Sequence, residues 1–446
     1  MRRYLLVLIL PTILLAIYDT KWMNVNRLVC AINNWGMFAH NEGNPGAYWP
    51  KPLRNFYIFG AGLWIGCIQN NDTLLTCGYE ANSAASEMVP TLCQYWRGGY
   101  TDSLDRIYVY PGDWPPPRSR FPMAPTSPLS ERDFFACFGD SDPTFHFPND
   151  TRPIGIDVAL TVYAFNDSIA RDFIFLKYEL FNFNSYPINH IYFGIQLDGD
   201  VGDYSDDMAG FIRNKLFLIG PDTIRVKNTG FIYDYDGREP PSEFWESGTP
   251  GAIAVRFLAS SVQEEISAFH LWTIEDDPIN DPSRYQMMAS NTFDSIDELP
   301  ADKRFLIASG PFDLLPESSA RFYYALIASP FSPSDTTELA MTAYWAERVF
   351  RERLGIEEVK SRKEGYGLSL YPNPFRSILT INSSSHSEIR VEIYNASGQM
   401  VKSIKGLPPI YWNARDENGK ILPKGLYFLR IESPKGRITK KILFLP

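Results

Sequence analysis

The sequence predicts an all-β protein, with a large β-sandwich body that carries one long helix and a separate β-domain at the C-terminus. Its 446 residues are enough for two or three domains of ordinary size. Aromatic residues make up 15% of the chain and charged residues only 21%, a balance that favours well-packed β-structure over extended disorder. With 42 basic and 52 acidic side chains, the chain lacks the basic surface that nucleic acid or an anionic membrane requires.

Alternation of apolar residues predicts strands along most of the body. Residues 172–183 are the clearest case, because apolar side chains occupy both faces of the expected strand, which places it inside a sandwich. Further strands are expected at residues 55–68, 73–79, 154–165, 191–197, 252–258, 305–309 and 320–327.

One helix is expected at residues 334–355. Ser334 or Asp335 can cap its first turn, apolar residues then recur at helical spacing, and Gly355 ends it. This is the one clear helix that the sequence predicts, and it follows the β-rich body.

A change in charge marks the expected domain boundary. The β-rich body is expected at 18–333, and a charged linker at 356–365 follows the helix. Residues 366–446 carry 12 basic and 5 acidic side chains, so the residues before them carry 30 and 47. The net charge therefore changes from −17 to +7, which supports a separate C-terminal domain at 366–446.

Residues 1–17 have the layout of a secretory signal peptide. Arg2 and Arg3 precede an apolar stretch that is too short to span a bilayer comfortably. Cleavage after Ala16 is expected, although Leu14 fits the small-residue rule poorly. A retained anchor and a buried N-terminal strand are the alternatives.

The five cysteines fit an oxidising compartment only in part, because an odd number leaves one of them unpaired. Cys67 and Cys77 are the best candidates for a disulfide, since they flank the turn-forming residues 69–72 and a hairpin there would bring them together. The alternative is that all five are small buried apolar residues: Cys30, Cys67, Cys77, Cys93 and Cys137.

Four ordered signatures occur in the last 80 or so residues, at 370–375 (LYPNPF), 391–399, 411–419 and 425–428 (GLYF). Short alternating strands are separated by Ser-Gly, Asn-Gly and Lys-Gly turns, which supply the positive φ of a tight reversal. These signatures resemble the FlgD-like immunoglobulin domain and the type A sorting domain of the type IX secretion system. The resemblance implies an immunoglobulin-like β-sandwich at the C-terminus.

The sorting-domain resemblance implies export to the cell surface, contact with the secretion machinery and proteolytic removal of the domain. Residues 440–443 look like the closing strand of such a sorting signal. Trp412, expected between the two sheets, and Asp416 favour the FlgD-like form, which occurs in bacteria that lack this secretion route. Both forms therefore stay open.

The body has a looser resemblance of its own. It resembles an uncharacterised region of exported bacterial proteins that carry such C-terminal domains, and this resemblance implies no activity. The segments that carry it are 175–182, 191–194, 198–210, 285–289 and 309–312.

The strongest chemical pattern is the acidic segment 198–207, with the sequence DGDVGDYSDD. Its carboxylates repel one another unless they are solvated or bridged, and its glycines let the loop curl oxygens around a hard cation such as Ca²⁺. Asp234 and Asp236, in a second loop, can add oxygen ligands, although the spacing is not that of an EF-hand. A solvated acidic turn is the alternative. The expected metal ligands are Asp198, Asp200, Asp203, Asp206 and Asp207.

Catalytic motifs are scarce. No Gly-x-Ser-x-Gly elbow, His-Glu-x-x-His helix or phosphate-binding loop occurs. The carboxylate pairs at 264–265 and 276–277 can serve a glycosidase only at a separation that the sequence does not give. Four histidines are interpreted as packed or surface imidazoles: His40, His146, His190 and His270. Five tryptophans are interpreted as core aromatics, with a sugar-binding platform as the alternative: Trp35, Trp49, Trp64, Trp96 and Trp114.

We therefore expect an exported cell-surface or secreted protein with a structural or binding role. Its expected partners are the envelope secretion machinery, through the C-terminal domain, and a surface glycan or protein, through the body. The competing hypothesis is a secreted hydrolase that acts on polysaccharide, which a cleft lined by two suitably spaced carboxylates would favour.

Overall fold

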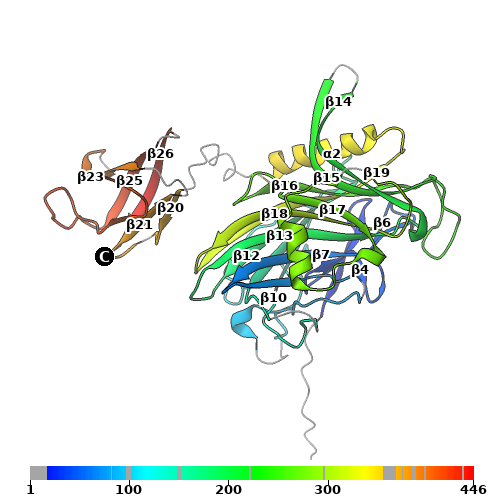
Figure 1. The fold of residues 1–446 in the computed structure, drawn as a ribbon, viewed down its shortest axis with the longest axis horizontal. Coiled ribbons are helices and arrows are strands. Elements are labelled where there is room, and N and C mark those ends of the chain that lie inside the picture. The colour runs from blue at the N-terminus through cyan, green and yellow to red at the C-terminus, as the bar shows by residue number, and fades with distance from the viewer. Residues whose placement is uncertain are drawn as a thin grey trace, which may run out of the picture. The chain divides into compact units, whose positions relative to one another are not determined.

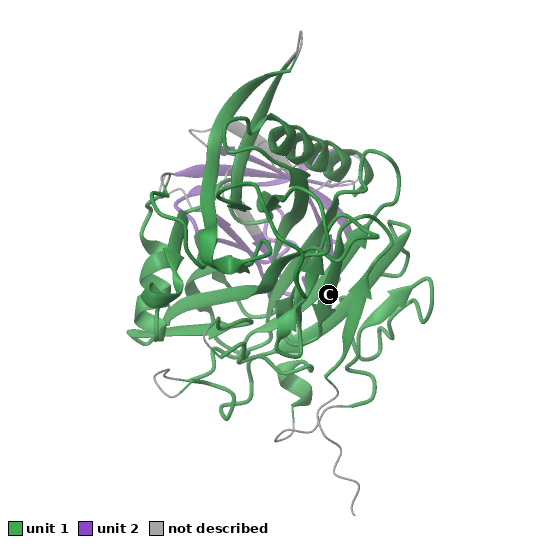
Figure 2. Ribbon diagram, turned by 90° about the vertical axis from the view of Figure 1, so that its right-hand side faces the viewer, with its two compact units in different colours: residues 1–355 green, residues 356–446 purple. Residues whose placement is uncertain are grey.

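The computed structural model divides the chain into two compact units, residues 1–355 and 356–446 (Figure 2). It describes residues 18–81, 83–96, 102–147, 152–219, 222–294, 297–354, 368–373, 375–383, 388–395, 398–433 and 436–445. The expected signal peptide at 1–17 and the expected linker at 356–365 lie outside the described residues. In the described part of the chain, no helix has the length and apolarity needed to cross a bilayer.

The described residues of the first unit form two large antiparallel sheets (Figure 1). A nine-stranded sheet contains β1 (Thr20–Met23), β2 (Val29–Asn33), β3 (Met37–Phe38), β6 (Ala47–Tyr48), β7 (Phe56–Gln69), β8 (Asp72–Cys77), β13 (Ile188–Gly199), β17 (Ala268–Thr273) and β18 (Lys303–Leu314). An eight-stranded sheet contains β9 (Tyr108–Tyr110), β10 (Arg132–Gly139), β11 (Asp157–Ala164), β12 (Phe173–Asn182), β14 (Asp207–Ile219), β15 (Asp222–Asp234), β16 (Gly251–Ser260) and β19 (Ser318–Pro330). A small separate pair contains β4 (His40–Asn41) and β5 (Asn44–Pro45).

The two large sheets enclose one continuous apolar core. Phe193 on β13 stacks against Phe322 on β19, with ring centroids 4.6 Å apart, so the two sheets are in direct contact. The prediction of an all-β sandwich body is confirmed. Because most inward-facing side chains are fully excluded from water, their burial is the main stabilising contribution to this unit.

The strand expected at 172–183 is β12, and it lies in the interior of the eight-stranded sheet. Its Leu176 and Tyr178 face the sandwich core, whereas Phe175 on the opposite face contacts Phe350 of a helix. Both faces are apolar because one packs on the other sheet and one packs beneath a helix.

That helix is α2 (Thr337–Arg353), in the region where a helix was expected. Its apolar side chains at helical spacing are buried against the eight-stranded sheet, chiefly against β19 and β15. The described residues contain a second α-helix that was not predicted, α1 (Asp281–Ala289), which packs on the nine-stranded sheet around Met288. Short 3₁₀ turns occur at Cys93–Tyr95, Tyr204–Asp206 and Ile274–Asp276.

The expected pairing of Cys67 with Cys77 is wrong. The predicted hairpin exists as β7 and β8, but its register places Cys67 opposite Leu74 and Cys77 opposite Trp64. All five cysteines lie in the described part of the chain, none of them forms a disulfide, and four of them are buried. They pack as small apolar side chains, which was the alternative interpretation.

The second unit is a small β-sandwich that follows the expected immunoglobulin-like pattern of two facing sheets. Its described core contains Trp412, which lies 5.5 Å from Phe375 and 5.8 Å from Tyr427 between ring centroids. One sheet contains β20 (Leu368–Tyr371), β21 (Leu379–Ser383) and β24 (Ile410–Trp412). The other contains β22 (Ile389–Asn395), β23 (Met400–Gly406), β25 (Gly425–Ser433) and β26 (Gly436–Phe444).

Candidate metal centre

The acidic segment lies where the chain passes from one sheet to the other (Figure 1). β13 ends at Gly199 in the nine-stranded sheet, and β14 begins at Asp207 in the eight-stranded sheet. β15 runs antiparallel to β14, so that its last residue, Asp234, pairs with Asp207. The loop after β15 therefore returns to the acidic segment and adds its own carboxylates there.

The first carboxylate group contains Asp198, Asp200 and Asp302, whose oxygens lie within 4.8 Å of one another. Arg304, which is 3% exposed, enters this group: its Nε lies 3.1 Å from Asp198 Oδ1, and its Nη1 lies 3.4 Å from Asp302 Oδ1. Asp277 Oδ2 is 3.6 Å from the same Nε. Three acidic side chains, Asp198, Asp277 and Asp302, thus share one guanidinium, and the local charge is only partly balanced.

Hydrogen bonds fix the innermost carboxylate of this group. Tyr79 Oη donates to Asp198 Oδ2 over 2.8 Å. Burial raises the pKa of Asp198 above the usual value, while the positive charge of Arg304 opposes the shift. Burial also raises the pKa of Asp200, and the neighbouring charge of Asp198 adds to that increase.

The second group contains Asp206, Asp234 and Asp236, again with oxygens within 4.8 Å of one another. Oxygens on opposite sides of a Ca²⁺ ion lie up to about 5 Å apart, because each is roughly 2.3 to 2.6 Å from the metal. Glu239 joins this group: its Oε1 accepts a hydrogen bond from the Asp203 N–H over 2.9 Å. Among the described residues, no ion pair involves any of these carboxylates.

Buried oxygens of the second group lack hydrogen-bond donors. Asp234 is 3% exposed, and its Oδ1 accepts from the N–H groups of Gly237 and Arg238. Its Oδ2 is buried without a partner among the described residues, as is Oδ1 of Asp206. An unpaired buried carboxylate oxygen is costly unless a cation or a proton satisfies it.

A neighbouring carboxylate shares this environment. Asp207 is fully buried, and its Oδ2 accepts a hydrogen bond from the Val201 N–H. Its Oδ1 has no hydrogen-bond partner in the described part of the chain. Burial raises its pKa well above the usual value, and the charges of Asp200 and Asp206 add to the shift. Burial likewise raises the pKa of Asp206 to about 6 and that of Glu239 to about 7, with Asp234 contributing to both.

Gly202 allows Glu239 to reach the site. Its φ is +76°, and an added Cβ would lie 2.2 Å from Glu239 Cδ, so a side chain here would collide with that carboxyl group. Gly202 thus adopts a positive φ and a close approach to Glu239 that a larger residue would prevent.

The five expected ligands do not all lie in one group. Asp198 and Asp200 lie in the first group with Asp302, whereas Asp206 lies in the second with Asp234 and Asp236. Asp203 begins the 3₁₀ turn, where its Oδ1 accepts from the Ser205 N–H. Sequence reasoning missed Asp302, Glu239 and Arg304, because each lies in a different segment from 198–207.

The histidines lie in four separate environments. His40 is held by the carbonyl of Phe59 and the N–H of Gly43, and burial lowers its pKa. His146 lies 3.2 Å from Glu87; burial lowers its pKa, but this carboxylate raises it to about 9 overall. His190 is exposed, and His270 contacts Asp294 and Ser290.

The other sequence candidates have mainly structural contacts. Each of the two carboxylate pairs has one member in an ion pair. Asp277 pairs with Arg304, and Glu265 pairs with Lys227. Two of the five tryptophans, Trp49 and Trp64, are buried, as expected of core aromatics.

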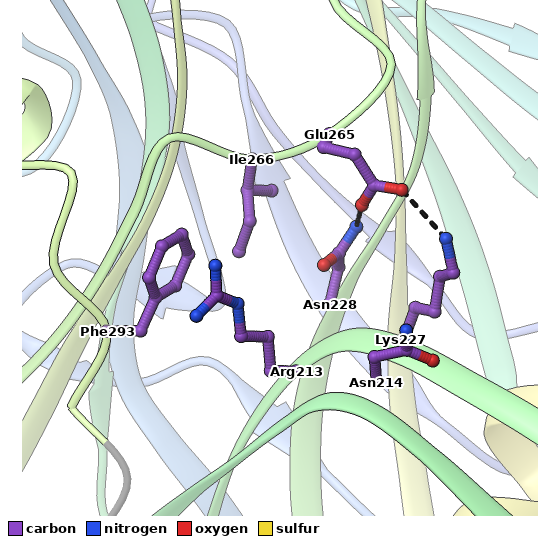
Figure 3. A pocket seen from close by; sticks show the side chains of 7 residues that line it. All are labelled: Arg213, Asn214, Lys227, Asn228, Glu265, Ile266 and Phe293. Carbon is purple, nitrogen blue, oxygen red and sulfur yellow. Dashed lines mark hydrogen bonds and ion pairs between the residues drawn. The ribbon is translucent and has the colours of Figure 1, made fainter.

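A hollow of about 200 Å³ lies between β14, β15 and the loops that carry Glu265 and Phe293 (Figure 3). The guanidinium of Arg213 stacks over the Phe293 ring, 3.8 Å from its centroid. Across the hollow, Glu265 accepts hydrogen bonds from Lys227 Nζ over 2.8 Å and from Asn228 Nδ2 over 2.9 Å. No acceptor for the Arg213 guanidinium occurs among the described residues.

Residues 369–444 match the family described as the secretion system C-terminal sorting domain. The C-terminal unit is a type IX sorting domain. The chain is therefore exported to the cell surface, and its sorting domain interacts with the type IX secretion machinery. The FlgD-like form stays a prediction. No match was found among curated proteins.

Similarities to solved structures are weak. A polysaccharide lyase gives a TM-score of 0.26 at 8% identity, over 96% of this chain and 46% of that one. Latent PorU from Porphyromonas gingivalis gives a TM-score of 0.17 at 14% identity, and the match covers 56% of this chain and 31% of PorU. PorZ, a surface component of the type IX secretion system of the same bacterium, gives a TM-score of 0.17 at 10% identity. This match covers 96% of this chain and 58% of PorZ. This chain spans less than two thirds of each, and no functional conclusion follows from scores this low.

Proposed function

We propose that this exported protein is a calcium-binding surface protein, in which the sorting domain directs export and the β-sandwich body serves a structural or ligand-binding role. The proposed metal site is the second carboxylate group, formed by Asp206, Asp234 and Asp236, with Glu239 beside it. The first group, with Asp198, Asp200 and Asp302, shares Arg304 and is proposed as a weaker site.

The observation that carries this proposal is the pair of buried oxygens on Asp206 and Asp234 that have no hydrogen-bond partner among the described residues. Ca²⁺ prefers carboxylate and carbonyl oxygens and accepts irregular geometry, which suits a site built from two loops. A bound divalent cation would satisfy both oxygens and would reverse the repulsion among the surrounding carboxylates.

The position of the site explains why binding would matter at the cell surface. The acidic segment is the crossover between the two sheets, and the loop after β15 closes over it. A cation that joins these loops would fasten the crossover segment to the end of β15. The metal and the fold would then stabilise each other.

Calorimetric titration of the full-length chain with CaCl₂, after treatment with EDTA, tests the proposal. We expect uptake of Ca²⁺ and a higher melting temperature, since a ligand at about 100 times its dissociation constant adds about 2.7 kcal/mol. Asp234→Asn and Asp206→Asn should remove this increment. Asp72→Asn, at an exposed aspartate of the β7–β8 hairpin, is the matched control and should retain it.

The metal-free variants give a second criterion. Asp206→Asn should melt at an equal or slightly higher temperature than the metal-free wild type, because the substitution relieves repulsion. If EDTA does not change the melting curve and calorimetry detects no uptake, the segment is a solvated acidic turn.

A ligand site in the Arg213 hollow is a second proposal, favoured by the stacked guanidinium whose edge is free to pair with a carboxylate. We propose an acidic surface glycan as the ligand, since the neighbouring Asn214 and Asn228 amides suit sugar hydroxyls. Binding of polygalacturonate should be lost in Arg213→Ala and retained in Arg348→Ala, which changes an exposed arginine of α2 that pairs with Glu352. Equal binding by both variants would contradict this assignment.

A further inference from the structure

Three chemically complementary side chains meet where α1 returns to β17. His270 projects from β17, Ser290 is the residue that caps the C-terminal end of α1, and Asp294 follows four residues later. The chain segment after α1 runs alongside β17: the Phe269 N–H donates to the Thr292 carbonyl, and the Asp294 N–H donates to the Phe269 carbonyl. These backbone hydrogen bonds hold Asp294 next to His270.

The three side chains contact one another in the order carboxylate, imidazole, hydroxyl. Asp294 Oδ2 lies 3.2 Å from His270 Nδ1, and His270 Nε2 lies 2.7 Å from Ser290 Oγ. Asp294 Oδ2 also accepts from the Leu271 N–H over 3.1 Å. Because an ionised carboxylate only accepts, Nδ1 carries the proton and Nε2 is left as the acceptor for the Ser290 hydroxyl.

A second hydroxyl completes the arrangement. Thr292 Oγ1 donates to Ser290 Oγ over 2.8 Å and lies 3.2 Å from His270 Nε2. The Thr292 N–H also donates to Ser290 Oγ, over 3.2 Å. Since Ser290 Oγ accepts both of these bonds, its own proton is directed to the imidazole. Of the two hydroxyls that contact His270 Nε2, that of Ser290 is the nearer.

We propose that Ser290, His270 and Asp294 form a hydrolytic triad that cleaves short-chain carboxylic esters. Such triads occur on unrelated folds and in several chain orders, and they are recognised by the geometry and roles of their members. No sequence motif indicates this triad, because its serine lies at a helix end and not in a Gly-x-Ser-x-Gly elbow.

The reaction balances without any cofactor. Ser290 Oγ forms a bond to the ester carbonyl carbon as its proton passes to His270 Nε2 and the carbonyl electrons move to oxygen. Collapse of this intermediate breaks the ester C–O bond, and the departing alcohol takes the proton from His270. Water then attacks the acyl-serine and gives a proton to His270, which returns it to Ser290 Oγ as the carboxylic acid leaves.

The surroundings offer space for the substrate and a donor for the oxyanion. A hollow of about 380 Å³ opens beside the triad, with Met287 and Pro278 as apolar lining and Gln286 as a polar group. Asn291 directly follows the nucleophile, has a φ of +56°, and its N–H has no acceptor among the described residues. In serine hydrolases the residue after the nucleophile commonly supplies one oxyanion donor.

Covalent labelling of the full-length protein tests the triad. A fluorophosphonate probe reacts with an activated serine by displacement of fluoride, and peptide mass spectrometry locates the adduct. We expect a single adduct at Ser290 in the wild type, together with hydrolysis of p-nitrophenyl acetate. His270→Asn should slow both reactions by about 10²- to 10⁴-fold, the usual contribution of a general base.

Two further variants make the outcome specific. Ser290→Ala should abolish the adduct, and Ser103→Ala, which changes an exposed serine in a different loop, should keep it at Ser290. Absence of an adduct in folded wild-type protein, an adduct at Thr292, or a labelling rate that His270→Asn leaves unchanged would each overturn the proposal.

Discussion

The two carboxylate groups differ in whether a basic side chain balances their negative charge. In the first group, the buried guanidinium of Arg304 lies within 4 Å of Asp198, Asp277 and Asp302. In the second group, the described residues provide no such cation for Asp206 or Asp234. The first group is therefore held mainly by the protein's own charges, and the second depends on a proton or a metal ion.

Arg304→Met is expected to destabilise the body strongly. The substitution leaves several buried carboxylates without their counter-charge, and breaking a buried pair in this way costs about 3–5 kcal/mol. Urea unfolding at pH 7 measures the effect. Arg225→Met, which removes an exposed arginine bonded only to Asn214 among the described residues, should change stability by less than about 0.5 kcal/mol. Equal effects of the two substitutions would contradict this role.

Stability without metal should fall as the pH rises from about 4 to 7. Burial raises the pKa of Asp206 from 3.8 to about 6 and that of Glu239 from 4.5 to about 7, so the folded protein binds protons that the unfolded chain has already released. Stability is therefore present at low pH and is lost across this range. Melting curves in EDTA at successive pH values test the direction.

Stabilisation by calcium should increase as the pH rises, because Ca²⁺ binds the deprotonated carboxylates. The calcium-dependent increment in melting temperature should therefore grow between pH 5 and pH 7. Glu239→Gln is expected to reduce the pH dependence in EDTA. An increment that does not change over this range would show that these carboxylates are not the ligands.

At the scale of secondary structure, α2 covers the eight-stranded sheet through both apolar and charged contacts. Arg256 on β16 is 2% exposed and donates from Nη1 to the carbonyl of Ala343 over 2.7 Å. Its Nη2 pairs with Glu347 of the same helix. Burial lowers the pKa of Arg256 to about 10, and Glu347 limits the shift.

Glu347→Leu should destabilise the body by about 3 kcal/mol, because it leaves the Arg256 guanidinium buried without its carboxylate. Glu352→Leu on the same helix removes an exposed pair with Arg348 and should cost less than about 1 kcal/mol. The double variant Arg256→Met/Glu347→Leu should recover most of the lost stability. Denaturant unfolding of the four proteins distinguishes this pairing from a packing role of Glu347 alone.

Elements with regular apolar patterns were predictable from the sequence, and those held by polar contacts were not. β12 and α2 were predicted because apolar side chains recur at strand and helix spacing. The pattern fails for α1, since Asp281 and Arg284 are among its buried residues and Pro282 lies in its first turn. Its start is fixed instead by the reciprocal hydrogen bonds of Asn280 and Ser283.

The candidate site was predictable only within one segment. The acidic segment 198–207 indicated a cation site. Asp302 and Asp234 lie beside it because β18 pairs with β13 and β15 pairs with β14. The triad shows the same limit, because the return of α1 to β17 brings Ser290 to His270. Contacts between distant segments depend on the topology, which the local pattern does not contain.

At the scale of the whole molecule, the chain combines an acidic body with a basic sorting domain. Residues 366–446 carry 12 basic and 5 acidic side chains. The described residues of this domain have an apolar core of their own, centred on Trp412 and Phe375. A domain with its own core is expected to fold independently of the body.

Residues 366–446, produced alone, are therefore expected to unfold in a single cooperative transition. Trp412 is the only tryptophan in this segment, so its fluorescence reports directly on the core. It is 1% exposed, and Nε1 donates to the Arg415 carbonyl over 3.0 Å. Trp412→Ala should cost about 3–5 kcal/mol, enough to unfold many small domains, whereas Tyr411→Ala changes a neighbour that is 63% exposed and should be tolerated. If the isolated segment shows no cooperative transition by circular dichroism, the sorting domain requires the body for its fold.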